Sequence, residues 1–227
     1  MKYLFLAITA LLAFSCASAP PPETFSVSLD SRRYEAGEIE ANFDRYLSIG
    51  SLRKAPVKVY YYPDEDAVCL QFKMQLTINC QQFWDRQGRD AFTAALQRYR
   101  EDFEQGKLAK ANRKTRGVYG KARGFFAWKK TPVSAQAYGP LEYKLGYQFE
   151  KKSVFFTATQ SEAYFEHRVL KSMNQTSPVL VTYYTRAQAE SLVALFSQEY
   201  LQGLGRPSGG TGGSGPGETK PDAYNEY

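Results

Sequence analysis

A run of alternating apolar and polar residues is the clearest structural signal of the sequence. Its apolar members are Val68, Leu70, Phe72, Met74, Leu76 and Ile78. Successive side chains of a strand point to opposite faces of a sheet, so these six share one face, and the residues between them, from Cys69 to Asn79, share the other. The pattern predicts one continuous antiparallel strand over 68–79 with a single buried face.

Other strands are predicted where aromatic and β-branched residues concentrate. Such side chains fit a pleated, half-buried surface, and the chain has 17 Tyr and 15 Phe residues. The predicted strands cover 57–62, 117–128, 143–150, 153–159 and 179–184, and the alternation of Phe25, Val27 and Leu29 adds one before them. The acidic stretch that begins at Pro63 has the composition of a turn.

Apolar residues at helical spacing predict helices at three places. The first covers 35–48 and carries Ile39, Phe43, Tyr46 and Leu47. The second opens with a capping box of Asn79 and Gln82, and its stripe is Phe92, Leu96, Tyr99 and Phe103; Gly88 either bends this helix or delays its start. The third opens with a capping box of Thr185 and Gln188 and carries Leu192, Leu195, Phe196 and Leu201. Residues 161–172 fit a helix or a strand.

Together these segments predict an α+β fold, mainly an antiparallel sheet packed with two or three amphipathic helices. Two strand–helix units, 67–105 and 178–202, look alike, which leaves an internal duplication open as an alternative. We expect a single globular domain over 25–204. Residues 205–227 are rich in Gly, Ser and Pro with almost no aliphatic side chains, so we expect them to form a disordered tail.

The N-terminus has the form of a secretory signal. Met1 and Lys2 provide a positive charge, and the apolar run from Tyr3 to Phe14 is interrupted only by Thr9. This run of 12 residues is too short to span a bilayer as an ordinary transmembrane helix. We therefore expect residues 1–15 to be removed and the rest of the chain to be exported.

The residues Ala13-Phe14-Ser15-Cys16 resemble the lipobox of bacterial lipoproteins, and Phe14 matches the looser versions found in spirochaetes and Bacteroidetes. This resemblance covers the first 16 residues and implies a lipid on Cys16 that anchors the protein to a membrane, with 16–24 as a Pro-rich spacer. Ala17-Ser18-Ala19 offers an ordinary cleavage site instead, but Pro20 would follow the cut and fits poorly into an extended protease cleft. Ala17 is not the aspartate that retains enteric lipoproteins at the inner membrane, which favours the outer membrane.

Positive charge is concentrated in one segment of the chain. Of the 29 Lys and Arg residues, nine lie between Lys107 and Lys130, with no acidic residue among them. They are Lys107, Lys110, Arg113, Lys114, Arg116, Lys121, Arg123, Lys129 and Lys130. The remainder of the mature chain has more acidic than basic residues, so the net positive charge depends on this basic segment.

Four aromatic residues are interleaved with these cations: Tyr119, Phe125, Phe126 and Trp128. Cations neutralise a polyanion and aromatic rings stack on sugars and other planar groups, so the combination favours an anionic partner such as lipid headgroups or acidic glycans. A nucleic acid would match the positive charge, but export of the protein disfavours it as the partner. The alternative is a solvated loop followed by a strand whose aromatic rings face the core.

The sequence contains no recognisable catalytic or metal-binding motif, and we expect no cofactor. His167 is the single histidine. Cys69 and Cys80 would be separated by about 36 Å on one continuous strand, whereas a disulfide needs Cα atoms within about 7 Å. A disulfide therefore requires that strand to be broken. We expect a non-enzymatic binding or structural module; the alternative is an envelope enzyme acting on glycan or lipid through carboxylates dispersed in the sequence.

Overall fold

The computed structural model describes residues 25–44, 52–74, 78–108, 116–129 and 136–204, and within them the fold is an antiparallel sheet closed into a barrel. The barrel strands are β1 (Tyr34–Asp44), β2 (Leu52–Tyr62), β3 (Ala67–Met74), β4 (Ile78–Trp84), β5 (Arg116–Lys129), β6 (Ala137–Glu150), β7 (Ser153–Gln160) and β10 (Val181–Tyr184). Each pairs with its neighbour in sequence, and β10 lies between β7 and β1. The expectation of a mainly antiparallel sheet with helices is confirmed.

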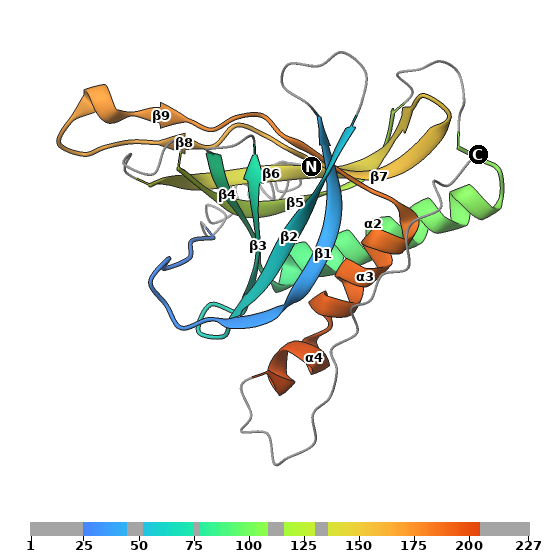
Figure 1. Ribbon diagram of the computed structural model, residues 1–227, viewed down its shortest axis with the longest axis horizontal. Coiled ribbons are helices and arrows are strands. Elements are labelled where there is room, and N and C mark those ends of the chain that lie inside the picture. Colours follow the sequence, from blue (N-terminus) through green and yellow to red (C-terminus); the bar gives the residue numbers. More distant parts are fainter. Residues whose placement is uncertain (1–24, 45–51, 75–77, 109–115, 130–135, 205–227) are drawn as a thin grey trace, which may run out of the picture.

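Three helices among the described residues pack against the barrel or against one another. They are α2 (Arg86–Glu104), α3 (Arg186–Phe196) and α4 (Gln198–Gly203), and Figure 1 shows α2 and α3 side by side at one end of the barrel. Phe92 of α2 lies at the centre of the core, with its ring against those of Trp84, Phe156, Tyr184 and Phe196. Burial of large aromatic rings therefore joins the helices to the strands.

The outer face of the barrel carries a smaller apolar cluster. Tyr62, Cys69, Phe83 and Phe125 point outward there and are covered by the segment that starts at Phe25. This segment is not the strand that the alternation of Phe25, Val27 and Leu29 predicts, because it pairs with no other described strand.

The predicted continuous strand over 68–79 is wrong, because β3 and β4 form a hairpin in which Phe72 lies opposite Cys80. The apolar alternation runs on through both strands without a change of phase, so it could not reveal the break. The predicted capping box at Asn79 is wrong for the same reason, since Asn79 lies within β4. Helix α2 begins at Arg86, and its N-cap is Asp85, whose side chain accepts a hydrogen bond from Gly88 N at 2.6 Å.

The predicted helix over 35–48 is also wrong, because Tyr34–Asp44 forms strand β1. Ile39 and Phe43 are four residues apart, a spacing that places two side chains on one face of a strand as well as of a helix. Both side chains are buried in the core. Pairing with β2 along the whole strand decides between the two possibilities.

Several predictions are confirmed. Strands β2, β5, β6, β7 and β10 overlap the predicted ranges, and the Thr185–Gln188 capping box opens α3. The last predicted helix is divided at Ser197 into α3 and α4. Within 161–172, the strand alternative holds for the short strand β8 (Tyr164–Phe165); the chain then leads into a 3-10 turn (Lys171–Met173) and returns as β9 (Gln175–Thr176). The duplication stays a prediction.

Among the residues that the structure describes, no helix combines the length and the apolar content needed to cross a membrane. The predictions for the signal peptide, Cys16, the spacer and the tail over 205–227 concern residues outside the described ones.

Candidate functional site

Two neighbouring strands of the barrel separate at one end and leave a groove between them. Strands β2 and β3 pair only from Lys58 opposite Gln71 to Tyr62 opposite Ala67. Beyond Lys58, residues 52–57 of β2 continue along β1, while residues 72–74 of β3 continue along β4. The groove has a volume of about 320 Å³. It is lined by Glu38, Arg53, Ala55, Pro56, Lys58, Gln71, Phe72, Lys73 and Asn79.

The barrel has a second separation of this kind, and α3 fills it. Within the described residues, β1 pairs with β10 only at Asn42 and Phe43. Helix α3 packs against β1, and Gly37, with a φ of 148°, leaves room for the side chain of Leu195. Among the described residues, no element covers the β2–β3 separation in the same way.

The groove is cationic. Arg53, Lys58 and Lys73 line it, and none of the three has an ion-pair or hydrogen-bond partner for its side chain among the described residues. Glu38 is the one carboxylate in the lining, and it lies opposite Lys58 in the β1–β2 ladder. The lining thus has a formal excess of positive charge that an anionic group would neutralise.

The floor of the groove is apolar. Ala55 and Phe72 are buried members of the main core, and the ring of Phe72 stacks on Phe43 with centroids 4.6 Å apart. At the side, Gln71 Oε1 is buried and has no hydrogen-bond partner among the described residues. An anionic group with a small apolar part attached fits the cations and the floor, and a hydroxyl or N–H donor of the ligand would satisfy Gln71 Oε1.

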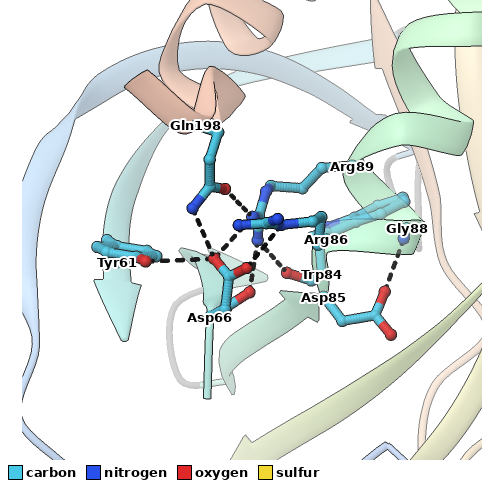
Figure 2. Close-up of polar contacts among 8 residues, drawn as sticks. All are labelled: Tyr61, Asp66, Trp84, Asp85, Arg86, Gly88, Arg89 and Gln198. Atoms are coloured by element: carbon cyan, nitrogen blue, oxygen red, sulfur yellow. Dashed lines mark hydrogen bonds and ion pairs between the residues drawn. The ribbon is translucent and has the colours of Figure 1, made fainter. Parts of the chain in front are cut away.

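A different cluster of charged residues joins three elements near the start of α2. Figure 2 shows Arg89, which is 2% exposed, donating to the backbone oxygens of Asp66 and Trp84 and to the side chains of Asp66 and Gln198. The Asp66 carboxylate also accepts from Tyr61 Oη at 3.2 Å and pairs with Arg86 Nε at 2.9 Å.

The polar groups of this cluster hydrogen-bond mainly to one another. Asp66 occupies the β2–β3 turn with a φ of 45°, so Arg89 ties this turn to α2 and, through Gln198, to α4. A hollow of about 410 Å³ lies beside it, with Arg86, Asp90 and Ser197 in its lining. Burial, and then the nearby negative charge of Asp66, raises the pKa of Tyr61. We assign the cluster a role in holding these elements together, and we take the β2–β3 groove as the candidate ligand site.

The structure places five of the nine cations of the basic segment. Lys107 follows α2 and is exposed, Arg116 begins β5, and Lys121, Arg123 and Lys129 lie along β5. Lys121 pairs with Glu142 at 3.0 Å, and Arg123 pairs with Asp85 at 3.1 Å. Lys110, Arg113, Lys114 and Lys130 lie outside the described residues. Lys129 is opposite Asn79, so the end of the basic segment lies one strand from the groove.

The aromatic residues of this segment pack within the protein. Phe126 and Trp128 are 0% and 1% exposed in the main core, and Phe125 packs in the outer cluster beneath Phe25. Tyr119 is half-buried and donates a hydrogen bond from Oη to Asp102. Three of these four rings are therefore not accessible for stacking on a ligand from solvent, because the alternation along β5 points them to the two apolar clusters.

The interior of the barrel contains polar atoms that the apolar alternation does not predict. Gln82 donates to Gln160 across the barrel at 2.9 Å. Five buried atoms on inward-facing positions have no partner among the described residues: Gln82 Oε1, Trp84 Nε1, Trp128 Nε1, Tyr143 Oη and Thr182 Oγ1. Burial raises the pKa of Tyr143, so its phenol stays protonated at neutral pH.

The two cysteines of the domain are free and buried on opposite faces of the sheet. Cys69 faces the outer cluster and Cys80 the main core, although the hairpin brings their strands together. Burial raises the pKa of Cys80 to about 12, and it raises that of Cys69 as well. Both thiols therefore remain protonated and unreactive under ordinary conditions.

His167 also has a structural contact, since its Nδ1 accepts a hydrogen bond from Leu170 N at 2.8 Å. Within the described part of the chain, no three His, Cys, Asp or Glu side chains come together to hold a metal ion.

Sequence reasoning missed the groove because its residues come from four strands. Arg53 and Lys58 are cations of β2 and Lys73 is a cation of β3, and these scattered charges are the local signal of the site. A charged residue in a strand can bind a ligand or simply be solvated, and local sequence does not distinguish the two. The groove exists because β2 and β3 stop pairing at Lys58, and this end of the pairing depends on the whole barrel.

Comparisons with known proteins give one match. A family model described as "Uncharacterised Treponema protein" matches residues 30–203, which covers the barrel and its helices. Searches of curated proteins and of solved structures returned no match. The chain belongs to this Treponema family.

Proposed function

We propose that the protein is a lipid-anchored envelope lipoprotein that binds an anionic ligand without catalysing a reaction. The observation that supports this most directly is the open groove, with Arg53, Lys58 and Lys73 in its lining and an apolar floor. The ligand would present a carboxylate or phosphate to the cations and an apolar part to Phe72. Anionic lipid headgroups and acidic glycans have this character.

The cellular location of the protein is part of the proposal. The lipobox-like residues at Cys16 support export and lipid anchoring, and the looser form of that motif agrees with a family named from Treponema, a spirochaete. We propose the outer membrane as its location. The basic segment from Lys107 to Lys130 is a second surface for the same polyanion, since Lys129 adjoins the groove.

The alternative of an envelope enzyme has less support. Hydrolysis of a glycosidic bond by the usual mechanism needs two carboxyl groups that face one another across the substrate. Glu38 is the single carboxylate among the residues that line the groove, and Asp66 is engaged by Arg86 and Arg89.

Co-sedimentation with the organism's envelope fraction tests the proposal. A soluble version beginning at Glu23 would be pelleted with the fraction over a series of salt concentrations. We expect pelleting to weaken as salt rises and to fall at least about threefold when Arg53, Lys58 and Lys73 are changed to Gln, because each neutralised cation removes a salt-sensitive contact. Changing Lys144, Lys151 and Lys152, which are exposed cations of β6 and the turn that follows it, removes the same charge and serves as the control.

A variant with the nine cations of the basic segment changed to Gln separates the two surfaces. Loss of pelleting in this variant alone would move the site from the groove to the basic segment. Pelleting that resists salt and survives all three variants would contradict binding of an anionic ligand.

A further inference from the structure

A hairpin arm extends from the barrel between β7 and β10. It consists of β8, the 3-10 turn and β9, and Figure 1 shows it projecting away from the helices. The arm is anchored at its base, where Ser177 N donates to Ala163 O at 2.8 Å and Ala163 N donates to the Ser177 side chain. Gly139 of β6 permits the crossing, because a Cβ there would lie 2.6 Å from the backbone oxygen of Tyr164.

The tip of the arm exposes two adjacent aliphatic residues between two cations. Val169 is 82% exposed and Leu170 is 52% exposed, and Arg168 and Lys171 on either side of them are exposed as well. No acidic residue occurs from His167 to Met173. Apolar side chains flanked by cations match the chemistry of an anionic membrane surface, where the cations meet phosphates and the aliphatic groups enter the headgroup layer.

Hydrogen bonds hold the tip in one conformation. Leu170 N donates to His167 Nδ1, and Met173 N donates to Leu170 O at 2.9 Å. Asn174 closes the turn, since its side chain accepts from His167 N and donates to Tyr164 Oη. Val169 and Leu170 are therefore presented without a further loss of backbone freedom on contact.

The arm lies on the same side of the barrel as the start of the domain. Phe25 contacts Phe125 with ring centroids 6.5 Å apart, Phe125 contacts Tyr138 at 5.8 Å, and Tyr138 contacts Phe165 of the arm at 5.3 Å. Nine residue steps separate Phe25 from Cys16, and they can span at most about 30 Å. A lipid on Cys16 would therefore keep this side of the barrel near the membrane.

We infer that the arm is a membrane contact: Val169 and Leu170 enter the headgroup layer of the anchoring membrane, while Arg168 and Lys171 bind its anionic phosphates. This inference rests on the proposed anchor at Cys16. It assigns the arm a role separate from that of the groove, namely to orient the barrel relative to the membrane surface.

A tryptophan at the tip tests the inference. The chain from Cys16 onward would be coupled through the Cys16 thiol to a maleimide lipid, a selective reaction because Cys69 and Cys80 are buried. Val169→Trp is the reporter, since the native Trp84 and Trp128 are 0% and 1% exposed. Val118→Trp is the matched control, because Val118 is 64% exposed near the opposite end of the β5–β6 hairpin.

The vesicles would contain phosphatidylcholine with phosphatidylglycerol and brominated acyl chains, which quench nearby tryptophan emission. We expect at least twofold stronger quenching for Val169→Trp than for Val118→Trp. The difference should disappear in pure phosphatidylcholine, and also when Arg168 and Lys171 are changed to Gln. Equal quenching of both reporters, or quenching that is unchanged in pure phosphatidylcholine, would overturn the inference.

Chemical coupling keeps this test independent of natural lipidation. Mass spectrometry of the exported protein, which would detect or exclude a lipid on Cys16, tests the anchor itself. A tip that is not quenched on a tethered protein would contradict the arm's role even if Cys16 is lipidated, and would leave a protein partner as the occupant of the tip.

Discussion

At the scale of single residues, the packing of the aromatic core depends on glycine, which has no side chain to obstruct neighbouring rings. The ring of Tyr143 on β6 stacks on that of Trp84 on β4, with centroids 3.9 Å apart, although β5 runs between their strands. Gly124 of β5 makes this possible, since a Cβ there would lie 2.1 Å from Tyr143 Cε2 and 3.0 Å from Phe83 O. Both rings are fully buried and cannot move aside.

We therefore expect Gly124→Ala to lower the free energy of unfolding by about 2–3 kcal/mol, the usual cost of overpacking a core. Gly120→Ala on the same strand is the control, because nothing lies within 4 Å of its Cβ position, and its effect should stay within about 0.5 kcal/mol. Urea unfolding followed by tryptophan fluorescence measures both. Equal losses in the two variants would contradict the close contact at Gly124.

At the scale of elements, a buried arginine joins parts of the chain that are distant in sequence. Arg89 of α2 and Arg86 both pair with Asp66 at 2.9 Å, but their side chains are 2% and 56% exposed. Asp85, the N-cap of α2, sets the start of this helix and so positions both side chains at the β2–β3 turn. The same carboxylate thus has one buried and one solvated partner.

This difference in exposure predicts that substitution of Arg89 destabilises the protein more than the same substitution of Arg86. Arg89→Gln should lower the free energy of unfolding by about 2–4 kcal/mol, because it removes four buried or partly buried hydrogen bonds and takes the donor from the buried backbone oxygen of Trp84. Arg86→Gln should cost less than about 1 kcal/mol, as exposed ion pairs do. The same urea titration compares them, and a larger loss for Arg86→Gln would exclude the clamping role of Arg89.

At the scale of the whole molecule, the barrel and the arm are separable units. Described contacts of the arm run mainly to β6, and Gln160 N donates to Leu180 O where the chain enters and leaves the arm. Removal of the arm leaves every ladder of the barrel in place.

We expect replacement of residues 164–176 by Asn-Gly to leave the barrel folded, with a loss of less than about 2 kcal/mol. The two-residue turn can join Ala163 to Ser177 because these residues already share a hydrogen bond, and Asn-Gly favours tight hairpins. Circular dichroism and urea unfolding would check the fold. Unfolding of this variant would show that the arm is part of the barrel's core rather than an attached contact.

Much of the strand content could be predicted from the local pattern of apolar residues. An element was missed where the spacing of its apolar residues fits both a helix and a strand. β5, β6 and β7 are long, rich in aromatic residues and bounded by turns, and Thr185 with Gln188 forms the predicted capping box. In β1, by contrast, Ile39 and Phe43 satisfy both strand and helix, and pairing with β2 made the decision.

The candidate site was less predictable than the fold. Local sequence identified the cations of the basic segment, but β5 pairs two of them with Glu142 and Asp85 and turns the neighbouring rings into apolar clusters. The groove cations do not form a motif, because Arg53 and Lys58 lie five residues apart on β2 and Lys73 lies on another strand, β3. Closure of the barrel separates β2 from β3 and so creates the site between them.

The sequence by itself determined which residues alternate and where α3 begins, and it predicts the anchor at Cys16, because these features depend on neighbours within a few positions. Tertiary structure alone decided where β3 turns into β4, that Cys69 and Cys80 face opposite sides, and that Arg53 and Lys73 share a groove. Those outcomes depend on pairing between strands and on what covers each face, and these are long-range contacts that no local period encodes.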